Sequence, residues 1–220
     1  MVTRAQLYWL LFLLAADTVA GAIAYPFLPP RSPIHWNLRG EVDGYGGPLE
    51  VALVFPLILL FAAGLPLAIA CIPSVAASIR RSVPVVGRML IAAVTILLVI
   101  HGLVLLNAFG RPVDVSLGCL VTIGLLLAVL GNWMGKLRRN PIAGIRTPWT
   151  LKSDVVWERT HRYGGRLMVA IGLASLLAAL VCPPWVAVAV LTLGVFVLLV
   201  WSFVYSWQLY RRLGSGQPAA

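Results

Sequence analysis

Residues 87–109 read GRMLIAAVTILLVIHGLVLLNAF, an almost wholly apolar stretch with one histidine well inside it. A helix of about 20 apolar residues crosses the hydrocarbon core of a bilayer, which is roughly 30 Å thick. Five further stretches are long enough, and the 220-residue chain is 60% hydrophobic and 11% charged, with a mean hydropathy of +0.94. This composition lies far outside the soluble range. The sequence therefore predicts an all-α membrane protein with six transmembrane helices, at about 5–28, 49–72, 87–109, 113–134, 165–182 and 185–208.

These six segments leave little chain for a soluble domain, so residues 1–220 are predicted to form a single integral membrane domain. Its N-terminal module covers residues 5–72, with a short outer loop at 29–48. A second region, 113–208, contains a motif-bearing loop at 132–166. The first span could also be a secretory signal, because a basic residue precedes it and small residues follow its core. Its apolar run continues to residue 28, longer than a signal core, so a retained helix is predicted.

Basic residues dominate the charge, which is formally +10. Lysine and arginine collect in the cytoplasmic loops of membrane proteins. Fourteen of the seventeen fall on one side of the predicted spans, and three, Arg31, Arg39 and Arg111, fall on the other. The fourteen are Arg4, Arg80, Arg81, Arg88, Lys136, Arg138, Arg139, Arg146, Lys152, Arg159, Arg162, Arg166, Arg211 and Arg212. Both termini and the loop 135–165 are therefore predicted to be cytoplasmic, and no direct nucleic-acid partner is needed to explain the charge.

The predicted cytoplasmic loop carries strong local signals. Two X-Pro pairs, beginning at Asn140 and Thr147, disfavour helix at the residue before each proline. The chain is therefore predicted to be turned or extended as far as Thr150. A helix can begin only afterwards, with Ser153 as its N-cap and Gly164-Gly165 as its stop. Aromatic and arginine side chains prefer the headgroup level, which places this helix along the inner membrane surface.

Two interpretations of the loop stay open. In the first, Trp149, Trp157 and Tyr163 anchor the interfacial helix at the headgroup level. The arginines are then topology signals that contact anionic lipid, and Glu158 pairs with the arginine four residues later. In the second, rigid turn chemistry holds Arg146 between two large apolar side chains as a binding surface.

Several short motifs mark this part of the chain. They are Asn-Trp-Met-Gly-Lys at 132–136, Asn-Pro at 140–141, Gly-Ile-Arg-Thr-Pro-Trp-Thr-Leu at 144–151, Val-Trp at 156–157, Thr-His-Arg at 160–162 and Gly-Gly at 164–165. Together they resemble the SdpI family, bacterial membrane proteins named for an immunity protein that protects its producer against a secreted peptide toxin. That protein also takes part in signalling through a cytoplasmic repressor. The resemblance implies a partner-binding role for Asn132, Gly135, Asn140, Gly144, Arg146, Thr147, Pro148, Trp149, Thr150, Trp157, Thr160, His161, Arg162 and Gly164.

The outer loop resembles the short N-terminal module, of the DUF1648 type, that is often found with this family. The matching residues, which the resemblance makes candidates for ligand contact, are Pro33, His35, Trp36, Asn37, Gly40, Asp43, Gly44 and Tyr45. Family members often have a basic residue just after the acidic-glycine-aromatic group. In this chain Gly46-Gly47-Pro48 follows instead, so the basic residue that many family members have at this point is absent here.

Asp43-Gly44 is a strong turn signal and predicts that the outer loop folds into a small hairpin. Trp36 and Tyr45 would then stand at the outer membrane surface, where a secreted amphipathic peptide arrives, or would form part of an aromatic belt. His35 with Asp43 is too small a ligand set for a stable metal site. Neither a metal nor a cofactor is predicted.

Two ionisable residues lie inside predicted spans, Asp17 in the first and His101 in the third. Such groups usually face protein or water. They lie at similar distances from the cytoplasmic ends of their helices, so they are predicted to pair, as a structural lock or as a proton or ligand site. Pro66, two residues after Gly64, is predicted to kink the second span. Inverted-repeat transporters carry matching broken helices in both halves, and no later predicted span contains an internal proline.

Motifs of membrane enzymes are absent from the sequence, whether a HExxH helix, a nucleophile elbow or paired catalytic carboxylates, so no enzyme activity is predicted. The resemblance implies a bacterial plasma-membrane immunity protein that protects against a secreted antimicrobial peptide and relays its presence to a cytoplasmic regulator. Two alternatives stay open: a small-solute or proton-linked transporter, and a scaffold that recruits a transcriptional repressor. The proline break and the Asp17 and His101 pair are the candidate elements that would couple the two faces.

Overall fold

Six long helices make up most of the computed structural model, which describes residues 2–72, 82–140 and 142–214. They are α1 (Arg4–Ala24), α2 (Pro48–Ala70), α4 (Val83–Ala108), α5 (Val115–Met134), α7 (Asp154–Val181) and α8 (Pro184–Gly214). All six are long and apolar enough to cross a membrane, so the predicted all-α fold with six spans is confirmed. Arg80, Arg81 and Pro141, which belong to the predicted charge pattern and motifs, lie outside the described residues.

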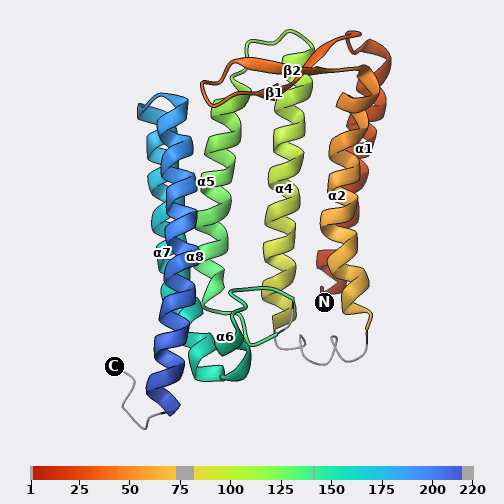
Figure 1. The fold of residues 1–220 in the computed structure, drawn as a ribbon. Coiled ribbons are helices and arrows are strands. Elements are labelled where there is room, and N and C mark those ends of the chain that lie inside the picture. The colour runs from red at the N-terminus through yellow and green to blue at the C-terminus, as the bar shows by residue number, and fades with distance from the viewer. Residues whose placement is uncertain (1, 73–81, 141, 215–220) are drawn as a thin grey trace.

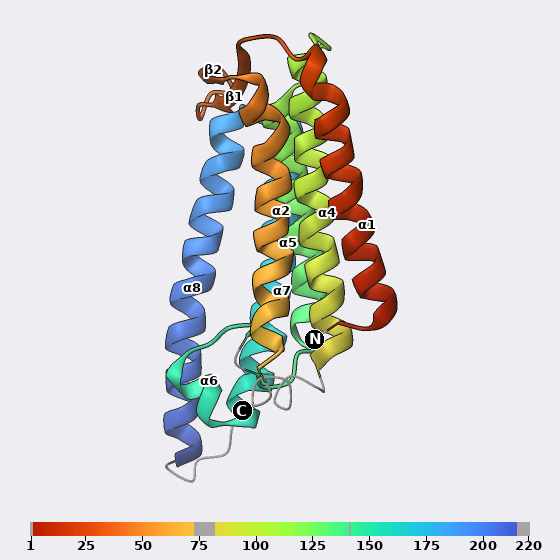
Figure 2. The same ribbon diagram turned by 90° about the vertical axis from the view of Figure 1, so that its right-hand side faces the viewer.

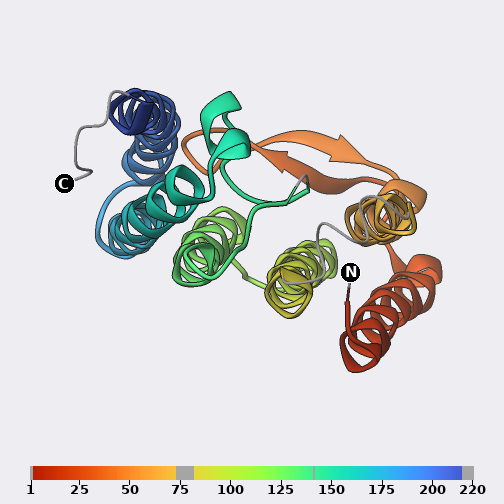
Figure 3. The same ribbon diagram turned by 90° about the horizontal axis from the view of Figure 1, so that it is seen from below.

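The two ends of the bundle differ in structure. A short 3-10 helix (Tyr25–Phe27) and a two-stranded hairpin lie at one end, while α1 begins and α8 ends at the other (Figure 1). The short helix α6 (Pro148–Lys152) and the loop around it also lie at that second end (Figure 2). Along the helix axes, α8, α7, α5 and α4 follow one another in an open arc that α1 and α2 continue (Figure 3). We call the two ends the hairpin end and the loop end.

Side-chain caps fix where several helices begin. The Thr3 hydroxyl and the Gln6 side chain form a reciprocal capping box at the start of α1. Gln6 Nε2 also donates to the carbonyl oxygen of Pro84 at 3.0 Å, which ties the start of α1 to the start of α4. Asp114 caps α5, and Ser153 caps α7 as the sequence predicts.

Among the described helices, α5 and α7 make the most extensive contact, and glycines bring them close together. A Cβ atom at Gly131 would lie 2.6 Å from the Gly165 carbonyl oxygen, and one at Gly165 would lie 2.6 Å from the Gly131 oxygen. Gly124 and Gly172 repeat the arrangement seven residues along each helix, where a Cβ atom at Gly172 would lie 2.5 Å from the Gly124 oxygen. In lipid, helices associate largely by close packing, so these two pairs let the backbones touch along two turns.

The predicted boundary between the loop and the fifth span is wrong. The sequence predicted an interfacial helix that stops at Gly164-Gly165, whereas α7 runs without interruption from Asp154 to Val181. Neither glycine has a positive φ. Gly165 belongs to the contact with α5, and a Cβ atom at Gly164 would lie 2.7 Å from Ile145 Cδ1. The two glycines therefore serve close packing instead of ending the helix.

The predicted hairpin is present, but its turn lies elsewhere. It consists of β1 (Ser32–Trp36) and β2 (Val42–Gly46), paired antiparallel with two irregularities in register. The Asn37 side-chain oxygen accepts from two backbone amides of the turn, at 2.8 and 3.1 Å, and Gly40 has a φ of +83°. Asp43 and Gly44, predicted to turn, lie inside β2. Gly44 instead allows close strand approach, because a Cβ atom there would lie 2.7 Å from His35 Cβ.

The glycine contact between α5 and α7 gives a stability prediction. We expect Gly131→Ala to lower the unfolding free energy by about 1–3 kcal/mol, because the added methyl group would overlap the α7 backbone. Gly64→Ala is the matched control, since no atom lies within 4 Å of a Cβ built there, and we expect it to be neutral or slightly stabilising. Thermal unfolding of both variants in detergent checks this. Equal shifts in the two variants would contradict the role of the contact.

Candidate functional site

The predicted pair of ionisable residues forms inside the membrane-spanning bundle. Asp17 Oδ1 on α1 lies 2.7 Å from His101 Nδ1 on α4, and the side chains are 2% and 0% exposed. The other ring nitrogen, His101 Nε2, lies 3.0 Å from the Val51 carbonyl oxygen on α2. The Phe55 ring stacks on the imidazole, with centroids 5.0 Å apart. The prediction that these residues pair is therefore confirmed, and the pair ties three helices together.

The hydrogen bonds of His101 fix the number of protons that the pair holds. A carbonyl oxygen can only accept, so His101 Nε2 carries a hydrogen that it donates to Val51. The bond to Asp17 then needs a second proton, either on Nδ1 beside an ionised carboxylate or on the carboxyl group itself. In both cases the pair holds two protons and has no net charge. Asp17 Oδ2 has no hydrogen-bond partner among the described residues, so within that part of the chain the carboxyl group bonds His101 through Oδ1 alone.

The backbone beside this pair explains how α1 and α2 come so close. Pro56 has no N–H, so it cannot donate to the carbonyl group of Ala52 four residues earlier. Gly21 on α1 lies against that group, where a Cβ atom would lie 2.3 Å from the oxygen. Sequence reasoning identified Asp17 and His101 but missed Gly21 and Val51. The sequence signal for this contact was a second proline in α2, Pro56, which follows the small residue Ala52 by four positions.

The hairpin covers this region and presents apolar side chains outward. Trp36 is half-buried against an apolar cluster that includes Val51. His35 Nδ1 lies 2.5 Å from Asp43 Oδ1 on the exposed side, and the Arg31 guanidinium lies 4.3 Å from the centroid of the Tyr45 ring. Pro33 pairs with Tyr45 across the strands. Three large apolar side chains of the hairpin are exposed: Ile34, Leu38 and Tyr45.

The loop end is built around two buried aromatic rings. The Trp157 indole N–H donates to the Leu137 carbonyl oxygen at 2.8 Å. The His161 ring stacks on the indole with centroids 3.9 Å apart, and both side chains are completely buried. The interpretation of Trp157 as an interfacial anchor is therefore wrong. An N–H donor that lies near backbone can find a partner inside the protein, so the ring does not need the headgroup region.

His161 closes the loop onto α7. Its Nε2 atom accepts from the Ile145 amide at 2.8 Å, which leaves Nδ1 to carry the hydrogen and donate to the Trp157 carbonyl oxygen, also at 2.8 Å. The imidazole is therefore neutral. Gly144 has a φ of +117°, and a Cβ atom there would lie 2.3 Å from His161 Nε2. Glycine at this position thus permits both the backbone conformation and the contact.

Small polar side chains hold the rest of the loop in place. Asn140 Oδ1 accepts from two following amides at 2.9 and 2.8 Å, forming the turn that the sequence predicts there. Thr147 caps α6 and donates to Ser206 on α8 at 2.9 Å, while Thr150 Oγ1 donates to the Ile145 carbonyl oxygen at 2.8 Å. The loop residues therefore bond both one another and α8.

The expected start of helix after Thr150 is wrong, because α6 already begins at Pro148. The residue before that proline is extended, as predicted, and proline itself is tolerated at the first helical position. Trp149, the next residue, is half-buried with its ring 4.8 Å from that of Phe203 on α8. The short helix therefore packs against α8.

Two arginines of the loop bind the acidic residues at the start of α7. Arg139 Nε lies 2.6 Å from Asp154 Oδ1, and its Nη1 donates to the Leu151 carbonyl oxygen at 2.7 Å. Arg138 Nη1 donates to Glu158. Glu158 thus pairs across the loop, and the expected pairing with Arg162 is wrong. The backbone of Arg138 is held as well, because the buried Ser82 hydroxyl bonds both its amide and its carbonyl group.

The remaining motif residues divide into exposed and buried positions. Asn132, Gly135, Arg146 and Arg162 are exposed, whereas Thr160 is completely buried. The exposed cations lie on a frame fixed by buried neighbours.

Predicted hairpin and loop residues lie at opposite ends of the bundle and form separate sites, and the Asp17 and His101 pair adjoins the hairpin end. Sequence reasoning missed Ser82 and Ser206, whose signal is a serine within or beside an apolar helix.

Comparison with known proteins agrees with the resemblance read from the sequence. Residues 136–206 match the SdpI/YfhL protein family, and residues 12–60 match a domain of unknown function, DUF1648. The chain is 24% identical over 198 residues to the immunity protein SdpI of Bacillus subtilis (strain 168), covering 89% of this chain and 91% of that protein. The expected resemblance is confirmed. No solved structure matches the chain significantly.

The buried pair gives the second prediction. His101→Phe leaves the Asp17 carboxyl group buried without its partner, and we expect it to cost roughly 3–5 kcal/mol of unfolding free energy. The double change Asp17→Leu with His101→Phe removes both polar groups, so we expect it to be less destabilising than His101→Phe alone. Unfolding free energies of both single variants and the double variant in detergent measure the coupling. Additive losses would rule out the pair.

The loop frame gives the third prediction. We expect Gly144→Ala to displace His161 and to speed tryptic cleavage after Arg146 about tenfold, equivalent to ~1.4 kcal/mol of local destabilisation. Gly214→Ala serves as the control, because no atom lies within 4 Å of a Cβ built at that position. Timed digestion of folded protein in detergent checks the rates. An unchanged rate in Gly144→Ala would show that the loop does not depend on this contact.

Proposed function

We propose that this chain, a multi-pass membrane protein whose residues 136–206 match the SdpI/YfhL protein family, is an immunity protein that protects its bacterial membrane against a secreted antimicrobial peptide. The observation that carries the proposal is the extent of the similarity to an immunity protein, which covers 89% of this chain. The two matched regions contain the hairpin with Asp17 and the loop with α7.

The proposal includes an orientation, with the hairpin end outside the cell and the loop end in the cytoplasm. Lysine and arginine concentrate on the cytoplasmic side of membrane proteins, and the described basic residues concentrate at the loop end. Arg31, Arg39 and Arg111 belong to the hairpin end. A secreted peptide would therefore meet the hairpin first.

The hairpin is suited to an amphipathic peptide. Ile34, Leu38 and Tyr45 expose apolar surface, and the hairpin also carries basic and acidic side chains around them. Trp36 anchors this surface to the apolar cluster above the buried pair. A peptide held on the hairpin would be kept from the surrounding lipid, which is a simple physical basis for protection.

A relay to a cytoplasmic regulator forms the second half of the proposal. The frame of Trp157 and His161 fixes a loop from which Arg146 points into solvent, so a regulator would meet a defined surface. The protein partner would be acidic at its contact, because the loop end is strongly basic. This preformed surface requires little ordering when a partner binds.

The fourth prediction tests immunity directly. Expression of this chain in a sensitive bacterium, challenged with a panel of secreted antimicrobial peptides, should raise the inhibitory concentration of at least one peptide severalfold. We expect Leu38→Asp with Tyr45→Asp to abolish that protection, because charge would replace the apolar hairpin surface. Arg146→Ala with Trp149→Ala probes the loop at matched membrane expression, and Arg88→Ala controls for loss of an exposed basic residue.

The outcomes separate the two halves of the proposal. Loss of protection in the hairpin variant alone places capture at the hairpin and leaves the loop for signalling. Loss in the loop variant but not in Arg88→Ala ties protection to the loop surface. Unchanged resistance to every peptide in cells that carry the correctly inserted chain would overturn immunity against that panel.

A further inference from the structure

The hairpin presents its second strand away from the helices. β1 packs against α2 and α4, whereas β2 has no comparable contact with the described helices. Two perpendicular views place β2 farther from the bundle than β1 (Figures 1 and 2). The open edge of this two-stranded sheet is therefore the outer edge of β2, at the hairpin end of the bundle.

One residue on this edge directs its backbone groups outward. The Asn37 amide donates to the Glu41 carbonyl oxygen at 2.9 Å, so the adjacent pair, Trp36 with Val42, is a non-hydrogen-bonded pair. In such a pair the N–H and C=O groups point away from the partner strand. No hydrogen bond from a described residue outside the hairpin reaches the backbone of residues 42–46. Val42 thus offers a donor and an acceptor to a further strand.

The exposed face of β2 has a pattern of charge and aromatic surface. Glu41, Asp43 and Tyr45 are exposed at alternate positions, so their side chains share one face of the strand. Glu41 accepts from a neutral side-chain amide at 2.9 Å, which leaves its charge in place. Asp43 bonds His35 through Oδ1, and the Arg31 guanidinium lies over the Tyr45 ring. A strand paired with β2 would therefore meet two carboxylates and then an aromatic ring.

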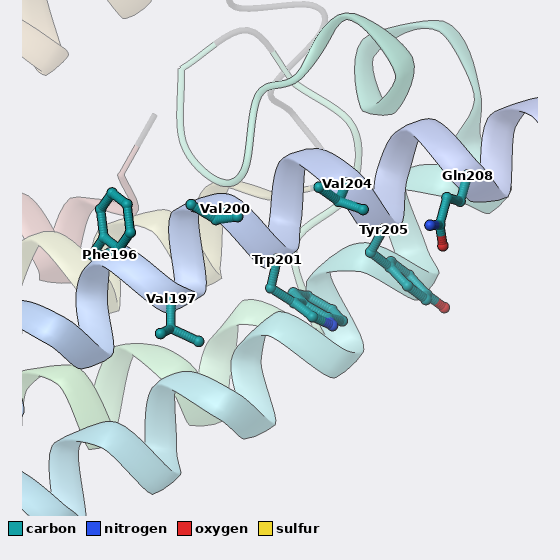
Figure 4. A pocket seen from close by; sticks show the side chains of 7 residues that line it. All are labelled: Phe196, Val197, Val200, Trp201, Val204, Tyr205 and Gln208. Atoms are coloured by element: carbon teal, nitrogen blue, oxygen red, sulfur yellow. The ribbon is translucent and has the colours of Figure 1, made fainter.

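The long groove on α8 lacks such polar groups over most of its length. It encloses about 360 Å³, and its lining from Phe196 onward is apolar or aromatic until Gln208 (Figure 4). Because α8 is long and apolar enough to cross the membrane, hydrocarbon chains can cover this face. The β2 edge belongs to the connection between two spans, where its backbone groups bond either water or another strand.

We propose that the β2 edge binds an extended peptide as a third strand, with basic side chains opposite Glu41 and Asp43 and an apolar side chain beside Tyr45. In this mode of recognition main-chain hydrogen bonds give affinity and side chains at alternate positions give selectivity. Opposite charges on neighbouring strands add to the pairing. Two copies side by side in one membrane would both direct this edge away from their helices, which favours a peptide from outside. This binding mode rests on the proposed function, in which the hairpin captures such a peptide.

An eight-residue peptide of alternating lysine and valine is a suitable probe, titrated into the full-length protein in detergent. We expect it to bind roughly tenfold more tightly than the same peptide N-methylated at every residue, which has no donors for strand pairing. Val42→Pro removes the outward N–H and keeps the bond between Asn37 and Glu41, so we expect roughly tenfold weaker binding. Val42→Ala is the matched control, because it shortens the same side chain and keeps the N–H, and its binding should stay within about twofold.

A charge reversal tests the edge without proline. We expect Glu41→Lys to bind the lysine-valine probe severalfold more weakly and to gain affinity for a glutamate-valine probe of the same length. Equal binding of the plain and N-methylated probes would overturn strand pairing, and so would equal losses in Val42→Pro and Val42→Ala. A dimer that Val42→Pro dissociates would also overturn it, because a second copy would then occupy the edge.

The same variants distinguish failure of this binding mode from failure of immunity. Protection of cells that survives in Val42→Pro at matched membrane expression would refute strand capture and leave immunity standing. Absence of protection against every peptide, alongside probe binding that Val42→Pro abolishes, would refute immunity and support the strand site.

Discussion

The hydrogen bond between Asp17 and His101 sets the arrangement of the N-terminal half. The hydrocarbon core offers no water to solvate either group, so each must find its partner in the protein. Because His101 also bonds the backbone of α2, one imidazole fixes α1, α2 and α4 relative to one another. The same arrangement brings Gly21 of α1 against the Ala52 carbonyl group of α2. Pro56 leaves that carbonyl group without its helical donor. The hairpin joins α1 to α2, so its base is held by the same contacts.

The loop end obeys the same requirement with other groups. Between α5 and α6 the described backbone turns without regular structure, and side chains of Asn140, His161 and Thr150 make hydrogen bonds that a helix backbone would otherwise supply. This accounts for the dense pattern of specified residues between 132 and 166. Most of them build the frame, and Arg146 and Arg162 are presented by it. The sequence allowed the 132–166 motif to be either a membrane anchor or a binding surface. In the structure most of its residues hold the loop in shape, and this shape presents the exposed arginines.

The sequence predicted what hydrophobicity and intramembrane charge determine. Span number followed from apolar length, and the pairing of Asp17 with His101 followed from the cost of an unpaired ionisable group in lipid. The errors arose where tertiary packing overrides a local signal. Gly164-Gly165 reads as a helix stop, yet the neighbouring helix needs that space. Asp43-Gly44 reads as a turn, yet Asn37 and Gly40 close the turn first, and the position of that closure depends on cross-strand contacts.

Helix α4 is the element that both separate sites contact. At the hairpin end it carries His101, and at the loop end Val86 packs in one apolar cluster with Trp157. Ser82, just before the helix, bonds the backbone of Arg138 on both its amide and its carbonyl group. A rigid helix that shifts along or about its axis must therefore move both sites together. The predicted proline kink in α2 would have no such double contact, because the described loop residues bond α7, α8 and Ser82 at the start of α4. Any relay from hairpin to loop consequently has its shortest physical route through α4.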